Sequence, residues 1–310
     1  MVLITNRSAT TLQIPIILCR ATRKYSQVPR PGTLATDSSS IVIPQLNAYE
    51  PRVSQDPNHV GQIHKFLNDR GILKVTLSFA DNDSRYLEML VRSLHQYHDH
   101  GLPITHSGSR GWFWDVRPTQ STQLPPAKNG NKKHIARSET MNTFAWHTDC
   151  SYEKNPPRFF ALHVLQDDQR GGGVLSVLQV DSLLSRLTTA TKEALSAPEY
   201  KIQVPPEFIK RDDNLYIVGN LLSLELQPHL RLREDIVTPL TGRARAAMVE
   251  LIGVLLGSQI EPDIISLHPP LLPKQSIILV DNRRWLHARS EVRDPRRHLR
   301  RVRWDARPFI

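Results

Sequence analysis

The order of hydrophobic and polar positions along the chain predicts two helices first and then a series of strands. Helical periodicity spans residues 59–68, closed by Gly71, and residues 83–97, with Asp81 or Asp83 as the expected N-cap. Apolar runs that are β-branched or alternating, which are typical of strands, dominate the rest of the chain. The predicted strands cover residues 72–79, 158–165, 174–180, 215–219, 230–232, 276–282 and 299–304, with a short first strand at 41–44.

Two further helices are expected among the strands. One begins at Asp181 and runs to about Ala197, and the other begins near Thr241 and runs to about Leu256 with its apolar positions on one face. Helices that precede a set of strands, instead of alternating with them, favour a helix-flanked antiparallel sandwich or barrel over a βαβ fold. The predicted fold class is therefore α+β, mainly β.

Composition agrees with a globular enzyme or binding protein. Hydrophobic residues make up 39% of the 310 residues, which is enough for a sizeable core, and 23 prolines against 14 glycines favour many short elements. Two cysteines, Cys19 and Cys150, exclude a disulfide framework. No apolar run approaches the roughly 20 residues that cross a bilayer, so no membrane span is expected.

The net charge of +10 is concentrated at the two ends of the chain. Residues 1–36 carry five basic residues and no acidic one, and residues 281–310 carry ten arginines against four acidic residues. The segment between them is nearly balanced. A nucleic-acid binder usually carries a basic stripe through its folded body, so no nucleic-acid partner is expected.

The basic N-terminal segment resembles a targeting signal. Residues 1–36 are rich in Arg, Ser and Thr and lack acids, which indicates a mitochondrial transit peptide. The sequence Arg-Lys-Tyr-Ser at 23–26 fits a matrix-processing cut after Tyr25, so the expected peptide is residues 1–25. The alternative is a basic tail on a cytoplasmic protein. Residues 26–55, rich in Pro and Ser, are expected to form a linker and entry segment, and residues 56–310 a single domain.

One set of polar residues indicates a candidate metal site. The tripeptide His147-Thr148-Asp149 alone is weak evidence, because about one such spacing is expected by chance in this composition. His287, however, follows a second apolar strand, and Arg297 comes ten residues later. Two His and one carboxylate on a single metal leave three positions open, which is typical of the facial triad of non-haem Fe(II) oxygenases. A keto acid and O₂ fill such positions, and a planar guanidinium suits the far carboxylate of the keto acid.

Three separated blocks make the chain similar to a known family. They are FAWHTDCSYEKNPPRFFALHVL (144–165), the GGG turn at 171–173 and DNRRWLHARSEVRDPRRHLRRVRW (281–304). In order and spacing they resemble the TauD/TfdA family of Fe(II)/2-oxoglutarate dioxygenases, including its clavaminate synthase-like branch and the γ-butyrobetaine and trimethyllysine hydroxylases. The resemblance covers about residues 150–310, and the N-terminal third matches only loosely. It implies a double-stranded β-helix (jelly-roll) core with flanking and inserted helices.

The resemblance also implies roles for individual residues. His147, Asp149 and His287 would bind Fe(II), and Arg297 would pair with the C5 carboxylate of 2-oxoglutarate. Arg301 matches a position that in several members reaches the primary substrate, which hints at an anionic group on that substrate. The oligomeric state is not predicted.

The implied activity is hydroxylation, or another oxidation, of an unactivated C–H bond of a small organic molecule, with O₂ as oxidant and release of succinate and CO₂. Because Asp149 is present, a halogenase is not expected. Val174 departs from the Thr or Ser that many members place after the Gly-Gly turn to assist 2-oxoglutarate. Two alternatives are a demethylase of a protein or nucleic acid with the same chemistry, and a catalytically silent binding protein on the same barrel.

Overall fold

Two sheets form the centre of the computed structural model, which describes residues 42–105, 111–119, 135–209, 215–224 and 227–310. In spatial order the larger sheet contains β1 (Gln45–Ala48), β2 (Ile72–Leu77), β13 (Ser276–Asp281), β5 (Pro157–Gln166), β15 (His298–Ala306) and β3 (Trp114–Val116). The smaller sheet contains β12 (Ile265–Leu267), β6 (Leu175–Gln179), β14 (Trp285–Arg289) and β4 (Phe144–His147). All pairings in the two sheets are antiparallel except that of β1 with β2. The expected combination of helices with mainly sheet is confirmed.

The inner faces of the two sheets pack against each other. Phe160 of β5 and Ile278 of β13 belong to the same buried cluster as Val177 of β6 and Trp285 of β14. Strand β5 is buried at eight of its ten positions, which is why its sequence is almost continuously apolar instead of alternating. Strands β4 and β14, which carry His147 and His287, are therefore held on a two-layer core.

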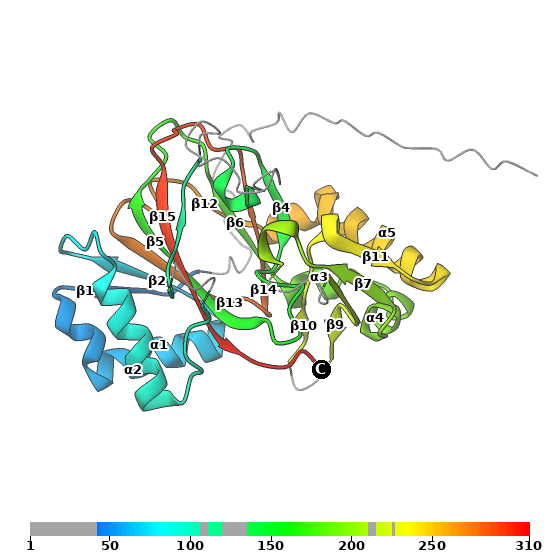
Figure 1. Cartoon of the computed structure of the whole chain (residues 1–310), viewed down its shortest axis with the longest axis horizontal. Coiled ribbons are helices and arrows are strands. Elements are labelled where there is room, and N and C mark those ends of the chain that lie inside the picture. The colour runs from blue at the N-terminus through cyan, green and yellow to red at the C-terminus, as the bar shows by residue number, and fades with distance from the viewer. Residues whose placement is uncertain (1–41, 106–110, 120–134, 210–214, 225–226) are drawn as a thin grey trace, which may run out of the picture. The chain divides into compact units, whose positions relative to one another are not determined.

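Helices α1 (Pro57–Arg70) and α2 (Arg85–His98) cover the outer face of the larger sheet, as Figure 1 shows. Helix α1 is capped by Asp56 and ends at Gly71, whose φ of 69° is the left-handed conformation that glycine adopts readily. The N-cap of α2 is Ser84 and not Asp81 or Asp83 as predicted, although the Asp81 carboxylate accepts hydrogen bonds from the backbone N–H groups of its first two residues. The helix ends at His98, one residue beyond the predicted range of 83–97, with Asp99 as its C-cap.

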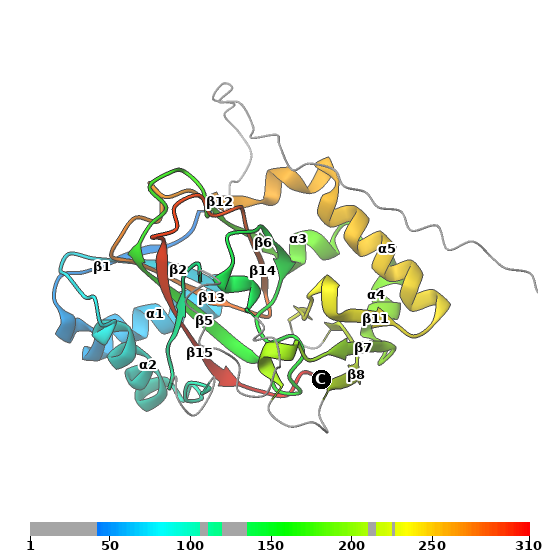
Figure 2. The ribbon, with the colours of Figure 1, turned by 45° about the horizontal axis from the view of Figure 1, so that its top comes forward.

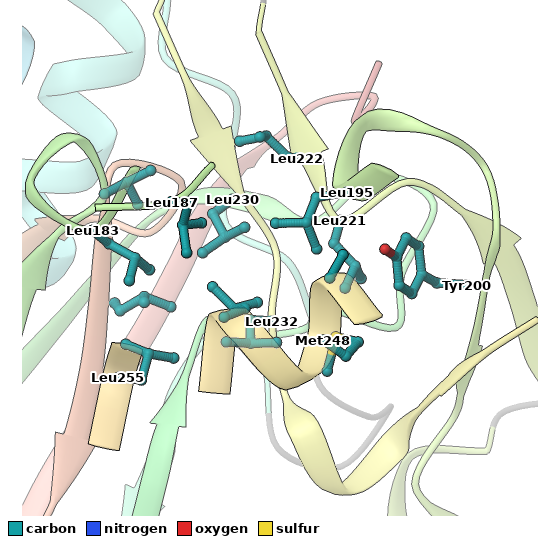
Figure 3. Packing of buried hydrophobic residues seen from close by; sticks show 14 of the residues in the cluster. Leu183, Leu187, Leu195, Tyr200, Leu221, Leu222, Leu230, Leu232, Met248 and Leu255 are labelled. Atoms are coloured by element: carbon teal, nitrogen blue, oxygen red, sulfur yellow. The ribbon is translucent and has the colours of Figure 1, made fainter. Parts of the chain in front are cut away.

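A third layer packs on the other side of the molecule, at the right in Figures 1 and 2. Helix α5 (Gly242–Leu256) packs there on α4 (Thr189–Ser196), and Figure 3 shows the leucine-rich cluster that they share. The predicted helix from Asp181 to Ala197 is wrong, since α3 (Val180–Leu184) ends early and the Thr188 side chain caps α4. The remaining strands of this layer are β7 (Tyr200–Gln203), β8 (Tyr216–Gly219), β9 (Leu222–Ser223), β10 (His229–Leu230) and β11 (Val237–Pro239).

Short elements complete the described chain. The first strand is β1, a few residues after the predicted strand at 41–44, and it pairs with β2. Five 3₁₀ turns are described, at Pro51–Gln55, Arg137–Glu139, Pro206–Phe208, Glu234–Ile236 and Ser258–Asp263. Among the described helices, none is long and apolar enough to cross a bilayer. The predicted transit peptide lies outside the described residues.

Candidate metal centre

The two predicted histidine ligands face each other across the smaller sheet. His147 is the last residue of β4, His287 is the third residue of β14, and the two are direct partners in the antiparallel register. Their ring centroids are 4.1 Å apart. Asp149 Oδ1 lies 3.9 Å from Nε2 of each ring, and one ligand atom from each of the three residues falls within 4.8 Å of the others. The structure thus brings the three predicted ligands together, and all three side chains are buried.

Asp149 reaches this position from a turn that follows β4. Strand β4 ends at His147, and Cys150 has a φ of 55°. The turn is fixed by Asn282, whose Oδ1 accepts from the backbone N–H of Asp149 at 2.7 Å and whose Nδ2 donates to the Asp149 carbonyl at 2.9 Å. The buried Asn282 therefore holds the backbone of Asp149 by two hydrogen bonds.

Hydrogen bonding leaves one nitrogen of His147 available to a metal. Nδ1 of His147 lies 2.8 Å from the carbonyl oxygen of Ala145, and a carbonyl only accepts, so we assign the proton to Nδ1. The Nε2 lone pair then points towards Asp149. Burial lowers the pKa of His147 well below its ordinary value and that of His287 to about 4, so both imidazoles are neutral, as metal ligands must be.

Two arginines from β15 surround the Asp149 carboxylate. Arg301 Nη1 donates to Oδ1 at 3.1 Å, and Arg303 Nη1 lies 3.9 Å from Oδ2. Burial alone would raise the pKa of Asp149, but the attraction of these two cations outweighs it and the pKa lies below its usual value. Asp149 is therefore an ionised carboxylate in the interior. Arg303 also contacts Sγ of Cys150 at 2.6 Å.

The donor set fits a divalent transition metal. Two neutral imidazoles and one ionised carboxylate converge from one side, which is the ligand set that non-haem Fe(II) sites use. Two buried polar atoms of these residues, Oδ2 of Asp149 and Nδ1 of His287, have no hydrogen-bond partner among the described residues.

A cavity opens onto His147 and Asp149. Its walls combine aromatic and charged side chains, and they include Ser138 and Arg137, which lie just before the β4 segment in sequence. On its rim Arg233 donates to Asp235 through two nitrogens, and Arg137 lies 3.3 Å from the same carboxylate. The lining residues are Ala136, Arg137, Ser138, Phe144, His147, Thr148, Asp149, Cys150, Tyr152, Glu207, Phe208, Arg233, Arg301 and Arg303.

Arg297 is buried but is not among the residues that line this cavity. Its Nη2 donates to the carbonyl of Gly173 at 3.4 Å, and Nη1 has no hydrogen-bond partner among the described residues. Burial lowers the pKa of Arg297 to about 9. Gly173 has a φ of 61°, and a Cβ there would lie 2.6 Å from Nε of Arg297, so the predicted Gly-Gly-Gly turn packs directly on this arginine.

Comparison with known proteins agrees with this geometry. No protein-family model matches the chain. The L-asparagine oxygenase of Streptomyces coelicolor is 30% identical over 171 residues, or 55% of this chain and 48% of that protein. The match thus spans about half the length of this curated relative.

Solved structures extend the comparison to most of the chain. Asparagine oxygenase with Fe(II), (2S,3S)-3-hydroxyasparagine and succinate superposes with a TM-score of 0.63 at 18% identity, over 83% of each chain. The chain has the fold of a non-haem iron oxygenase. The oxygenase OrfP, solved with Fe, succinate and (3R,4R)-dihydroxy-L-Arg, gives 0.59 at 17% identity over 82% of this chain and 85% of that one. The resemblance that the sequence motifs carry is confirmed.

Several residues of the cavity are not identified by the sequence motifs. Arg303 lies two residues from Arg301 on β15, so strand alternation could have placed both on one face. Arg233, Glu207 and Phe208 come from distant segments, and no local pattern connects them with the triad. Their role follows only from the tertiary structure.

Proposed function

We propose that the chain is an Fe(II)- and 2-oxoglutarate-dependent dioxygenase that hydroxylates a C–H bond of a small organic molecule. The observation that carries the proposal is the convergence of two neutral imidazoles and one ionised carboxylate beside buried arginines at the end of a cavity. The named relatives and neighbours support it, because they are oxygenases solved with iron, and with 2-oxoglutarate or succinate. Substrate and O₂ would give the hydroxylated product, succinate and CO₂.

In this proposal His147, Asp149 and His287 hold Fe(II) from one side. The bound iron, with 2-oxoglutarate and O₂, supplies the oxidising chemistry. The protein holds both imidazoles neutral and the carboxylate charged, and it presents the substrate from an aromatic-walled cavity. Together, the two-layer core and the third layer would form the double-stranded β-helix with inserted helices that the resemblance implies.

Two arginines are candidates for the distal carboxylate of 2-oxoglutarate. Arg301 lies in the cavity beside Asp149, whereas Arg297 lies against Gly173 with one nitrogen free of hydrogen bonds to the described residues. Each is buried, so pairing with a carboxylate would offset its desolvation. If Arg297 is the anchor, Arg297→Gln should steeply raise the concentration of 2-oxoglutarate that half-saturates turnover, and Arg301→Gln should change it little. If Arg301 is the anchor, the two variants should show the reverse.

We propose a small amino acid, or another small carboxylate, as the primary substrate. Relatives named for asparagine and a neighbour solved with hydroxylated arginines support an amino acid. The cavity rim offers matching chemistry, since Arg137 and Arg233 share the single carboxylate Asp235 and leave an excess of positive charge, while Glu207 provides an anion for an ammonium group.

The test is succinate release by enzyme reconstituted anaerobically with Fe(II) and then given O₂, 2-oxoglutarate and a panel of amino acids. A substrate should stimulate succinate release and gain one oxygen atom by mass spectrometry. Iron-bound enzyme that forms no succinate with any keto acid would favour the silent binding protein instead. Stimulation by a methylated peptide or nucleic acid, with release of formaldehyde, would favour the demethylase.

We also propose a mitochondrial location, which the Arg-rich, acid-free composition of residues 1–25 supports. The mature protein isolated from mitochondria should begin at Ser26 when its N-terminus is sequenced. An intact protein found only in the cytoplasm would contradict this.

A further inference from the structure

The oxygen of Asp149 that faces both imidazoles also accepts a hydrogen bond from Arg301. Oδ1 of Asp149 lies 3.1 Å from Nη1 of Arg301 but 3.9 Å from Nε2 of either histidine. Ligand atoms about 2.1 Å from one first-row metal ion, at right angles, are roughly 3 Å apart. Oδ1 of Asp149 is therefore closer to the Arg301 guanidinium than to the two histidine nitrogens that would bind the same metal ion.

The contact between Arg301 and Asp149 is strong because it is shielded from water. Their side chains are 7% and 5% exposed, so little water screens the attraction. The second oxygen of Asp149 faces Arg303, whose own contacts include the Cys150 sulfur. Without Arg301, Oδ1 of Asp149 would lose the hydrogen bond from Nη1, whereas Arg303 would remain beside Oδ2.

A divalent ion and the Arg301 guanidinium would compete for the same oxygen and repel each other. We propose that Arg301 is a positioning residue that holds the Asp149 carboxylate away from the metal, and that an anion bound to Arg301 releases it. This rests on the proposed function, in which the triad binds Fe(II). Arg301 then lowers the metal affinity of the free site, and a carboxylate ligand raises that affinity.

Thermodynamic linkage makes the effect reciprocal. If an anion on Arg301 raises metal affinity by a given factor, the metal raises anion affinity by the same factor, and such couplings are commonly about 5- to 150-fold. Metal and keto acid would therefore assemble together in the site. The opposite role for Arg301, support of the carboxylate in its metal-binding orientation, predicts the opposite sign.

The test measures Co(II) and Mn(II) affinity of the purified full chain by titration calorimetry, without turnover. Arg301→Gln is expected to bind metal at least about fivefold more tightly than wild type. The matched control is Arg300→Gln, which removes a cation from the neighbouring position of β15 that pairs with Asp115 instead. The control should leave metal affinity unchanged.

The second arm uses glutarate, a dicarboxylate that lacks the keto oxygen and so cannot chelate the metal as 2-oxoglutarate does. Glutarate should tighten metal binding by wild type about fivefold or more and have little effect on Arg301→Gln. Arg301→Lys, which keeps a buried charge without the planar fork, should fall between the two. Circular dichroism and thermal unfolding check that each variant folds.

The outcomes separate the two claims. Equal or weaker metal binding by Arg301→Gln, or an equal glutarate effect in both proteins, would overturn the role of Arg301 while leaving the metal site intact. If Arg301→Gln does not fold, the glutarate response of wild type decides, and its absence would overturn the inference. Failure of wild type to bind any divalent metal would instead overturn the proposed function.

Discussion

Replacing Asn282 with alanine is expected to loosen the turn that carries Asp149. The Asn282 side chain makes three hydrogen bonds, two to the backbone of Asp149 and one to the carbonyl of Pro157 at 2.9 Å. The residue is 1% exposed, so no water replaces these partners easily. Alanine would remove these three hydrogen bonds from buried backbone groups.

The expected cost follows from these contacts. A buried hydrogen bond contributes about 1 kcal/mol net, and each group left unsatisfied costs about 1–3 kcal/mol, so the loss is roughly 3 kcal/mol or more. For a large domain, each 1 kcal/mol lowers Tm by about 2–4 °C, which gives a decrease of roughly 6–12 °C. Because Asn282 orients a metal ligand, metal affinity should also fall about 10- to 100-fold.

The assay combines thermal unfolding with calorimetric titration of Co(II). The matched control is Asn220→Ala, which removes one hydrogen bond, to the carbonyl of Leu222 at 2.8 Å, far from the triad in sequence and without contact to it. The control should lower Tm by only a few degrees and leave metal affinity unchanged. If Asn282→Ala matches the control in both measurements, the reasoning about the turn is wrong.

The remaining predictions concern a glycine and a buried histidine. Gly173→Ala should destabilise the fold by about 1–3 kcal/mol in denaturant unfolding, because of the positive φ and the contact with Arg297; wild-type stability would contradict that packing. Burial lowers the pKa of His100 to about 4, against about 6.5 in the unfolded chain, although Asp305 opposes the shift. The contribution of neutral His100 to the free energy of unfolding is therefore fully present above about pH 6.5. It is lost as the pH falls towards 4, by up to about 3 kcal/mol at 1.36 kcal/mol per pH unit. Unfolding from pH 7 to 4.5 should show this loss, with a shallower profile for His100→Gln; identical profiles would refute it.

Local chemistry made the starts of two helices and the residues of the candidate metal centre predictable from the sequence. Helix α5 begins where it was expected, because the Thr241 side chain accepts from a backbone N–H in the first turn, and the short Asp81 side chain likewise reaches the first two N–H groups of α2. The convergence of His147 and His287 was predictable because each follows an apolar segment, and the two paired strands then bring the rings together.

The parts that could not be predicted depend on tertiary contacts. The helix expected from Asp181 is interrupted because Thr188 bonds to Glu250, which lies on α5. Asp149 leaves the strand because a distant amide, Asn282, holds its backbone in a turn. The ten-residue spacing draws attention to Arg297 and gives no sign of the contact between Arg301 and Asp149. A spacing rule does not include the bulge at the start of β15 that shifts its register.

The most direct test of the metal centre is anaerobic Fe(II) titration of the wild-type chain and of Asp149→Ala, followed by addition of O₂ and 2-oxoglutarate. The account predicts one Fe(II) per wild-type chain and iron-dependent formation of succinate, with both lost in Asp149→Ala. Iron-dependent succinate formation that survives in Asp149→Ala would contradict it.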